Sequence, residues 1–337
     1  MSVASENHPP TPYTYTRKRP PRCTVVFDTY WRFAAERQAI FHRRLENPLA
    51  PWTKDPILAT YKFTNAYRAS DRVSQFLIRN VIYRGIRTVK EVFFRTVLFK
   101  LFNRIETWKL FETEFGGIES EEFTIEGYDR ALTKAFKAGI PIYSGAYIMP
   151  SGGFSGRKHR MHLELLDRMM RDQLAERIAE LGSQPKAFHL LRSYPTIGDF
   201  LAYQYATDLN YSDLTRSDEM EFVVPGPGAL SGIRKCFEDF SDYSMADLIR
   251  WVCDRQEVEF ERLGVEFKSL WGRRLQLIDC QNLFCEVDKY ARIAHPEFSS
   301  GRTRIKQNFR PNTKPIEYWF PPKWELNHKI ETPERFV

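Results

Sequence analysis

Hydrophobic residues recur every three to four positions over most of residues 27–292, the spacing that places side chains on one face of a helix. Patterns of this kind cover residues 27–45, 56–82, 88–110, 127–137, 162–181, 196–208, 228–237, 244–260 and 275–292. Residues 140–149 are apolar, β-branched and aromatic, and could instead form a short extended segment. Because helical patterns dominate, the sequence predicts an all-α fold.

The two ends of the chain differ in composition from this helical region. Residues 1–22 combine several prolines with a run of basic residues, which predicts a flexible arm that could be a nuclear-localisation signal or bind phosphate. Residues 299–337 interleave basic and aromatic residues with prolines. We expect an irregular tail there that packs on the domain or contacts a nucleic-acid backbone. The expected organisation is therefore an arm (1–22), a helical domain (23–298) and a tail (299–337).

Composition narrows the class of protein. Hydrophobic residues make up 42% of the chain and aromatic residues 15%, too much for a disordered protein. The net charge of +7 permits a polyanionic partner without requiring one. Five cysteines without a CxxC pair favour reduced thiols over a structural metal site. With no long apolar run and no signal-peptide core, we expect a soluble intracellular protein with no membrane contact, nuclear in a eukaryote and otherwise cytoplasmic.

The most unusual polar pattern lies in residues 51–82. Here Tyr61, Asn65, Arg68 and Arg72 follow one another at steps of four, three and four, so one helix would carry them on a single face. Lys62 flanks that face. Tyr, Asn and Arg make directed hydrogen bonds, which is typical of a binding surface. The alternative is a structural face whose arginines pair with acids on neighbouring helices.

Two further stretches carry candidate binding residues. In residues 196–208, Asp199 lies in the first turn of an expected helix, and Gln204 and Asp208 share a face four positions apart. Helix capping and surface polarity explain these three residues equally well. Further along, Gly226 and Gly228 form a Gly-Pro-Gly turn before a helix, where unpaired backbone N–H groups and the helix dipole favour a phosphate.

The segment 275–292 is dense in ionisable groups among apolar residues. It contains Glu286, Asp288, Lys289 and Arg292 on neighbouring helical turns. A carboxylate held among apolar neighbours has a tunable pKa and could act as a general base. The alternative is a set of ion pairs that only stabilises the fold.

Two other patterns in the sequence do not fit the sites that they suggest. Residues 153–158 (GFSGRK) place the second glycine too early for a phosphate-binding P-loop, and no other segment supplies that motif. The chain is therefore not expected to be a P-loop kinase itself. His159 and His162 could face one metal ion, but no third ligand is evident, so no metal site is expected.

Taken together and in order, the motifs resemble a known family. The stretches WTKDPILATYKFTNAYRASDR, IGDFLAYQYATDL, GPGA and CEVDKYAR resemble the α-glutamyl/putrescinyl thymine pyrophosphorylases and the helical domain of 5-hydroxymethyldeoxyuridine (5-hmdU) DNA kinases. The first core helix and the VVPGPGALSG stretch also resemble helix-hairpin-helix DNA glycosylases. The resemblance covers roughly residues 27–321. It implies a glycosylase-like helical domain that works on DNA bases.

The resemblance implies DNA base hypermodification, in which an amine displaces pyrophosphate from an activated 5-hydroxymethyluracil in DNA. The implied partners are DNA, an amino acid or polyamine and a separate 5-hmdU kinase, with no cofactor. The expected catalytic residues are Asp288, Lys289, Glu286, Lys62 and Asn65. The expected substrate and phosphate contacts are Tyr61, Arg68, Arg72, Asp199, Gln204, Asp208 and Arg292. The expected contacts to the DNA backbone are Gly226, Gly228, Arg302 and Arg304.

Two alternatives remain open. The first is a base-excision glycosylase, although the closely spaced C-terminal cysteine cluster of the iron–sulfur branch is missing from the sequence. The second is a non-catalytic DNA-binding module that partners a 5-hmdU DNA kinase.

Overall fold

Helices dominate the part of the chain that the computed structural model describes, which is residues 18–145, 149–150, 156–298, 301, 303–314 and 316–330. Arg302, most of the predicted arm and the last residues of the predicted tail lie outside these ranges. Fourteen α-helices and one sheet of two short strands make up the regular structure of the described residues. The predicted all-α fold is confirmed.

The helices follow one another with few long connections. They are α1 (Val25–Glu46), α2 (Pro56–Thr60), α3 (Arg72–Phe76), α4 (Val89–Phe102), α5 (Ile105–Phe115), α6 (Ile125–Lys137), α7 (Lys158–Arg171), α8 (Leu174–Leu181), α9 (Gln184–Arg192), α10 (Asp199–Leu209), α11 (Pro227–Cys236), α12 (Met245–Asp254), α13 (Gln256–Arg262) and α14 (Leu277–Ala294). Strands β1 (Arg22–Cys23) and β2 (Phe237–Asp239) pair antiparallel. None of the described helices combines the length and apolar character that crossing a bilayer requires.

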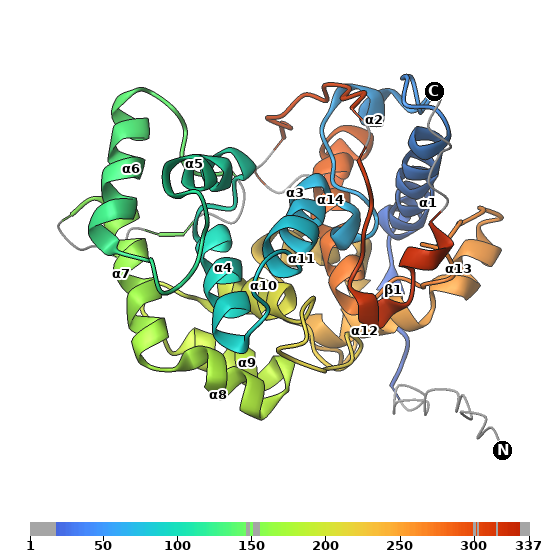
Figure 1. Ribbon diagram of the computed structural model, residues 1–337. Helices are drawn as coiled ribbons and strands as arrows, with labels where there is room; N and C mark the ends of the chain where they lie inside the picture. Colours follow the sequence, from blue (N-terminus) through green and yellow to red (C-terminus); the bar gives the residue numbers. More distant parts are fainter. Residues whose placement is uncertain are drawn as a thin grey trace, which may run out of the picture.

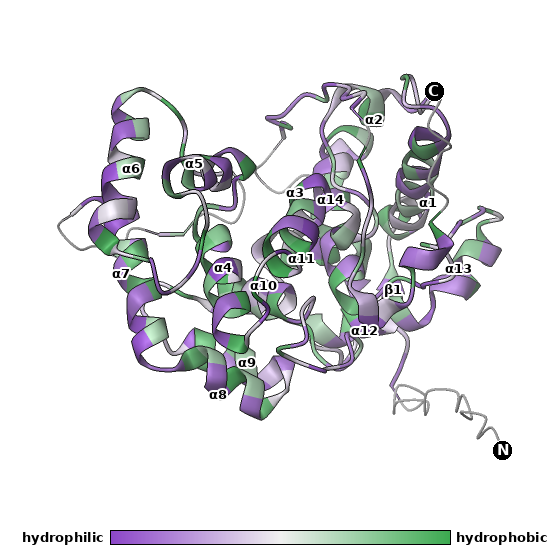
Figure 2. Cartoon of the chain, viewed as in Figure 1, coloured by the Kyte–Doolittle hydropathy of each residue, from purple (hydrophilic) through white to green (hydrophobic). Residues whose placement is uncertain are grey.

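The helices form two halves around a shared core (Figure 1). In one half, α4 packs against α7, α8 and α10. In the other, α1 and α14 pack against each other and both contact α11. Hydrophobic residues turn inward in both halves, and Figure 2 shows the resulting two-sided colouring along α7 and α8. One continuous cluster of buried side chains runs through the two halves.

Local sequence explains where several helices begin. Thr24 starts α1 by accepting a hydrogen bond from the Val26 amide at 3.1 Å. Ser244 starts α12 with a capping box, since its side chain and that of Asp247 each bond the other's backbone N–H. These caps satisfy N–H groups that have no partner inside the helix.

Glycine allows α11 and α14 to pack closely. A Cβ atom on Gly232 would lie 2.0 Å from the Phe284 carbonyl oxygen of α14. A Cβ on Gly226 would lie 2.6 Å from the Phe200 ring, and one on Gly228 would lie 3.0 Å from a neighbouring thiol sulfur. The Gly-Pro-Gly turn therefore has a packing role inside the protein, and its contact with a DNA backbone stays a prediction.

The single helix predicted for residues 56–82 is wrong. Helix α2 ends at Thr60, and a 3₁₀ turn η2 (Arg68–Ser70), α3 and a π-helical turn η3 (Leu77–Ile82) follow the extended segment in between. In that segment, backbone N–H groups donate hydrogen bonds to side-chain carboxylates that are distant in the sequence. The amides of Thr64 and Arg68 donate to Glu286 at 3.0 Å and to Asp279 at 2.8 Å on α14. Long-range carboxylates thus replace helical hydrogen bonds, and Tyr61, Asn65, Arg68 and Arg72 do not share a helix face.

The helix predicted for residues 244–260 is two helices, α12 and α13, which meet at Arg255. Two further predicted helices are each split at a residue with a left-handed backbone. The pattern over residues 88–110 is divided between α4 and α5 by Asn103, whose φ of 48° is left-handed. The pattern over residues 162–181 is divided between α7 and α8 by Gln173, with a φ of 51°. Asn is one of the residues that tolerate this conformation, and the Asn103 side chain also accepts a hydrogen bond from Lys100 Nζ at 2.9 Å. Hydrophobic periodicity continues across both breaks, so it could not reveal them.

The described part of the tail passes α2 and runs along the half of the domain that contains α1 and α14 (Figure 1). It is irregular apart from 3₁₀ turns such as η5 (Pro322–Trp324) and η6 (Asn327–Lys329). Tyr61 and Asn308 form an isolated antiparallel bridge, which fastens the tail to the segment after α2. Phe320 and Leu326 enter the hydrophobic core. The tail is therefore a structural part of the domain.

Candidate functional site

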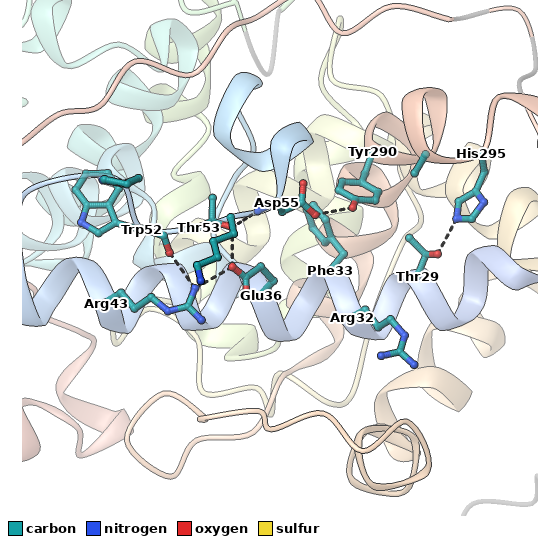
Figure 3. A pocket seen from close by; sticks show the side chains of 13 residues that line it. Thr29, Arg32, Phe33, Glu36, Arg43, Trp52, Thr53, Asp55, Tyr290 and His295 are labelled. Atoms are coloured by element: carbon teal, nitrogen blue, oxygen red, sulfur yellow. Dashed lines mark hydrogen bonds and ion pairs between the residues drawn. The ribbon is translucent and has the colours of Figure 1, made fainter.

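A groove of about 860 Å³ opens between α1, the turn that precedes α2 and the end of α14. Figure 3 shows the side chains that line it. The residues lining the groove are Thr29, Arg32, Phe33, Glu36, Arg43, Pro51, Trp52, Thr53, Lys54, Asp55, Tyr290, Ala294 and His295. The groove combines charged groups of both signs with aromatic rings.

Helix α1 supplies one wall of the groove because of its periodicity. Arg32, Glu36 and Arg43 are spaced by four and seven positions, so they lie along one side of the helix. The facing wall is the turn in which Asp55 begins α2. One Asp55 oxygen accepts from the backbone amides of the next turn, and the other accepts from the Tyr290 hydroxyl at 2.6 Å. Asp55 thereby ties α2 to α14 at the floor of the groove.

Hydrogen bonds hold the charged groups of the groove in position. Glu36 Oε1 accepts from Arg43 Nη1 at 2.8 Å and from the Thr53 hydroxyl at 2.6 Å. Arg43 Nη1 also donates to the Trp52 carbonyl at 2.9 Å. Arg32, at the edge of the groove, is exposed to solvent. The groove therefore presents a fixed carboxylate beside cations, which suits a ligand that carries both an anionic and a cationic group.

Three of the predicted substrate contacts, Arg68, Gln204 and Asp208, form a buried network, and their contact with a substrate stays a prediction. Arg68 Nη1 donates to Asp208 at 2.7 Å, and Arg68 Nε donates to Gln204 at 3.2 Å. The side chains of Arg68 and Asp208 are 3% and 1% exposed, and Lys100 Nζ lies 3.0 Å from the second Asp208 oxygen. Although burial alone raises the pKa of Asp208, Arg68 and Lys100 hold it below its ordinary value. This arrangement gives the network a structural role between α4, η2 and α10.

The predicted general base Asp288 is held in a second buried cluster. Its Oδ1 atom accepts from the Ser231 hydroxyl at 2.6 Å and lies 3.1 Å from Lys235 Nζ, both on α11. Its Oδ2 atom accepts from Arg292 at 2.5 Å. Burial alone raises the pKa of Asp288, but these three partners hold it below its ordinary value. A carboxylate in this state is a poor proton acceptor, so its role as a base stays a prediction.

Glu286 and Lys289 lie on a different side of α14 from Asp288. Glu286 Oε2 accepts from the Thr64 amide at 3.0 Å and lies 2.6 Å from Lys289 Nζ. The two predicted catalytic carboxylates, Glu286 and Asp288, therefore contact different residues. Each forms an ion pair, as the structural interpretation of this segment expects.

The other predicted site residues lie apart from the groove. Lys62, Arg72, Asp199 and Arg304 are exposed at different places on the surface. Asn65 is half-buried and its side-chain oxygen accepts from an arginine of α1 at 2.8 Å. The sequence prediction missed the groove residues of α1. Their spacing on α1 is that of any solvent-facing helix, so the sequence carried no signal that they line a site.

Comparison with known proteins places the chain in a family. Residues 24–300 match the family described as the helical domain of 5-hmdU DNA kinase, and the chain belongs to that family. A curated relative, the 5-hmdU DNA kinase of Bacillus phage SP10, is 30% identical over 300 residues. The matched region covers 81% of this chain and 46% of that relative, so the chain spans less than half the relative's length. No solved structure matches the chain. The resemblance to the 5-hmdU DNA kinase helical domain is confirmed, whereas the relations to the pyrophosphorylases and glycosylases stay predictions.

Proposed function

We propose that this protein modifies 5-hydroxymethyluracil in DNA, by displacing pyrophosphate from the activated base with an amine. Membership of the 5-hmdU DNA kinase helical-domain family supports the choice of DNA base. The groove supports the chemistry, and it is the observation on which the proposal depends. It brings Glu36 and Asp55 into one cavity with Arg32, Arg43 and Lys54.

The reaction needs both kinds of charge. The carbon–oxygen bond to pyrophosphate breaks while a carbon–nitrogen bond to the amine forms. The leaving pyrophosphate takes the bonding electrons, so its added negative charge requires cations, which Arg32 and Lys54 can supply from the groove wall. The incoming ammonium must lose one proton before it attacks, and the secondary ammonium that forms keeps its two remaining protons. Glu36 is the carboxylate that we assign to this proton transfer.

Glu36 suits this role better than Asp288 does. Glu36 is half-buried in an open groove, where an amine can reach it. The two oxygens of Asp288 are already engaged by Ser231, Lys235 and Arg292. The glycosylase alternative, which needs Asp288 as the base, is therefore less well supported by the geometry.

A second candidate function follows from the comparison of lengths. The chain matches less than half of the phage relative, whose name describes a kinase. On this alternative, the helical domain recognises the modified base in DNA and a separate kinase carries out the chemistry. It predicts salt-dependent DNA binding without any adduct.

Both candidates can be tested in one experiment. The purified protein is incubated with DNA that carries pyrophosphorylated 5-hydroxymethyluracil and with a mixture of amino acids and polyamines, and nucleosides are analysed by mass spectrometry. We expect an amine adduct whose formation slows roughly 100-fold or more in Glu36→Gln, the range for loss of a general base. The matched control is Glu46→Gln at the exposed end of the same helix. DNA binding without an adduct from any amine would refute the transferase and support the recognition module.

A further inference from the structure

We propose that a second, smaller cavity beside the groove binds the ring of an unpaired pyrimidine base from DNA. This proposal rests on the proposed function, because it names where the base of the same substrate lies. The cavity has a volume of about 110 Å³ and lies between α1, α2 and the tail. Pro51, Trp52 and Thr53 line both this cavity and the groove.

The size of the cavity suits one six-membered ring. The cavity has a volume of about 110 Å³ and opens to the surface beside the exposed lining residues Ala59 and Pro311. An apolar cavity of roughly 150 Å³ is known to take up benzene. A pyrimidine is of similar size, whereas a purine adds a second ring.

The walls of the cavity suit a base. Trp52, Tyr61, Phe63 and Phe309 line it, and the Trp52 and Phe309 rings lie 6.2 Å apart at 70°. Aromatic side chains bind nucleic-acid bases by stacking, and each stacked base contributes substantially to binding. Rings from both the helical domain and the tail would enclose the base.

Arg37 provides a fixed hydrogen-bond donor on the same cavity. Its Nε atom donates to the Thr64 carbonyl and its Nη2 atom donates to the Asn65 side chain, each at 2.8 Å. These bonds hold the planar guanidinium in one orientation. A pyrimidine of the uracil type carries two carbonyl oxygens, which are acceptors for such a donor. The cavity thus combines stacking surfaces with one directed polar group.

The tail forms one wall of the cavity, and basic side chains lie on the tail on both sides of that wall. The Phe309 amide donates to the Thr60 carbonyl at 2.8 Å, and the Lys62 amide donates to the Gln307 carbonyl at 2.9 Å. Arg44 donates to the Asn312 carbonyl at 2.8 Å, which fastens the tail at a second point. Exposed basic side chains on both fastened segments are Lys62, Lys306, Arg310 and Lys314. They provide cations for the phosphates on either side of a base that enters the cavity.

The small cavity and the groove share one wall, so a base in the cavity would lie beside the charged groups of the groove. Because the Pro51–Thr53 turn is a wall of both, a base in the small cavity lies next to the groove that holds Glu36 and the cations. The substituent on the ring then needs to extend only past this turn to reach them. The small cavity would select the base, and the groove would hold the groups that react.

Binding to short single-stranded DNA tests the proposal, because a single strand avoids the cost of extruding a base from a duplex. Fluorescence anisotropy compares two otherwise identical oligonucleotides that carry 5-hydroxymethyluracil or adenine at one central position. Ala59→Phe fills the cavity from an exposed lining position, and Thr60→Phe adds the same ring at the next exposed position, outside the cavity lining. Phe309→Ala removes one wall, and Phe298→Ala is its half-buried aromatic control.

We expect the wild-type protein to bind the pyrimidine oligonucleotide about tenfold or more tightly than the adenine one. Ala59→Phe and Phe309→Ala should lose that preference, while Thr60→Phe and Phe298→Ala keep it, with thermal melting confirming that all four fold. A wild-type protein without the preference, or an Ala59→Phe variant that retains it, would overturn the proposal.

The adduct assay separates this proposal from the proposed function. If Ala59→Phe forms the amine adduct as fast as wild type, the function holds and the small cavity is not the base site. If the wild-type protein forms no adduct but prefers the pyrimidine, and the Ala59→Phe variant lacks that preference, the cavity binds the base and the transferase function fails.

Discussion

Replacing Asp288 by Asn should destabilise the protein more than it impairs catalysis. The Asp288 and Lys235 side chains are 6% and 4% exposed, and their charged atoms lie 3.1 Å apart. The substitution keeps the shape of the side chain but leaves the Lys235 ammonium and Arg292 without their buried negative partner. Breaking a buried ion pair from one side costs about 3–5 kcal/mol. Because Asn can still accept one hydrogen bond, we expect a loss near the lower end, about 3 kcal/mol.

Urea unfolding followed by circular dichroism measures this loss. With a denaturant slope of about 3 kcal/mol per molar, the midpoint should fall by about 1 M. The double variant Asp288→Asn/Lys235→Met removes the stranded charge as well and should recover part of the lost stability. Adduct formation by the folded double variant should remain close to that of wild type. Asp288→Asn with wild-type stability and no adduct would refute this reasoning and identify Asp288 as the catalytic base.

Two further predictions concern packing and pH. Gly232→Ala should lower the free energy of unfolding by about 1–3 kcal/mol, because overlap of the new methyl group with the Phe284 carbonyl outweighs the gain of about 1 kcal/mol in helix propensity. The control is Gly117→Ala, where the new methyl group meets open space. Equal stabilities of the two variants in urea would contradict the packing role of Gly232. Burial raises the pKa of Asp71 to about 7 and that of Asp279 to about 6, so between pH 4 and 7 each of these carboxyls holds more protons in the folded protein than in the unfolded chain. Burial lowers the pKa of His162 to about 4, which acts in the opposite direction, so the carboxyl effect is measured against the variant Asp71→Asn/Asp279→Asn. The stability of wild type relative to this variant should fall as pH rises through the window, by up to about 1.4 kcal/mol per pH unit for each carboxyl, and urea titrations in which the difference rises with pH would disprove it.

Periodicity and capping rules predicted the framework of the fold. Helix α1 covers the pattern predicted over residues 27–45, and α12 begins where the pattern over residues 244–260 begins. The segment after α2 could not be predicted in this way. Its amides at Thr64 and Arg68 bond carboxylates of α14 that are more than two hundred positions away in the sequence. Local propensity gives no information about such partners.

The candidate site shows the same limit. The sequence drew attention to the turn at Trp52 and Asp55, which lines the groove. It did not identify Glu36 or Arg43, because their spacing on α1 is compatible with any solvent-facing helix. Only the packing of α1 against the end of α14 brings them opposite the turn. Residue chemistry could be predicted from the sequence, but which residues meet depends on the tertiary arrangement.

The packing of the tail determines where the protein can be truncated for expression. The family match ends at residue 300, but Phe320 is fully buried in the core and Phe309 lines the small cavity. An expression fragment designed on the family boundary would expose apolar core surface and aggregate. Because Phe309 and Pro311 of the tail line the small cavity, substitutions in this short segment would reshape the cavity without any change inside the helices.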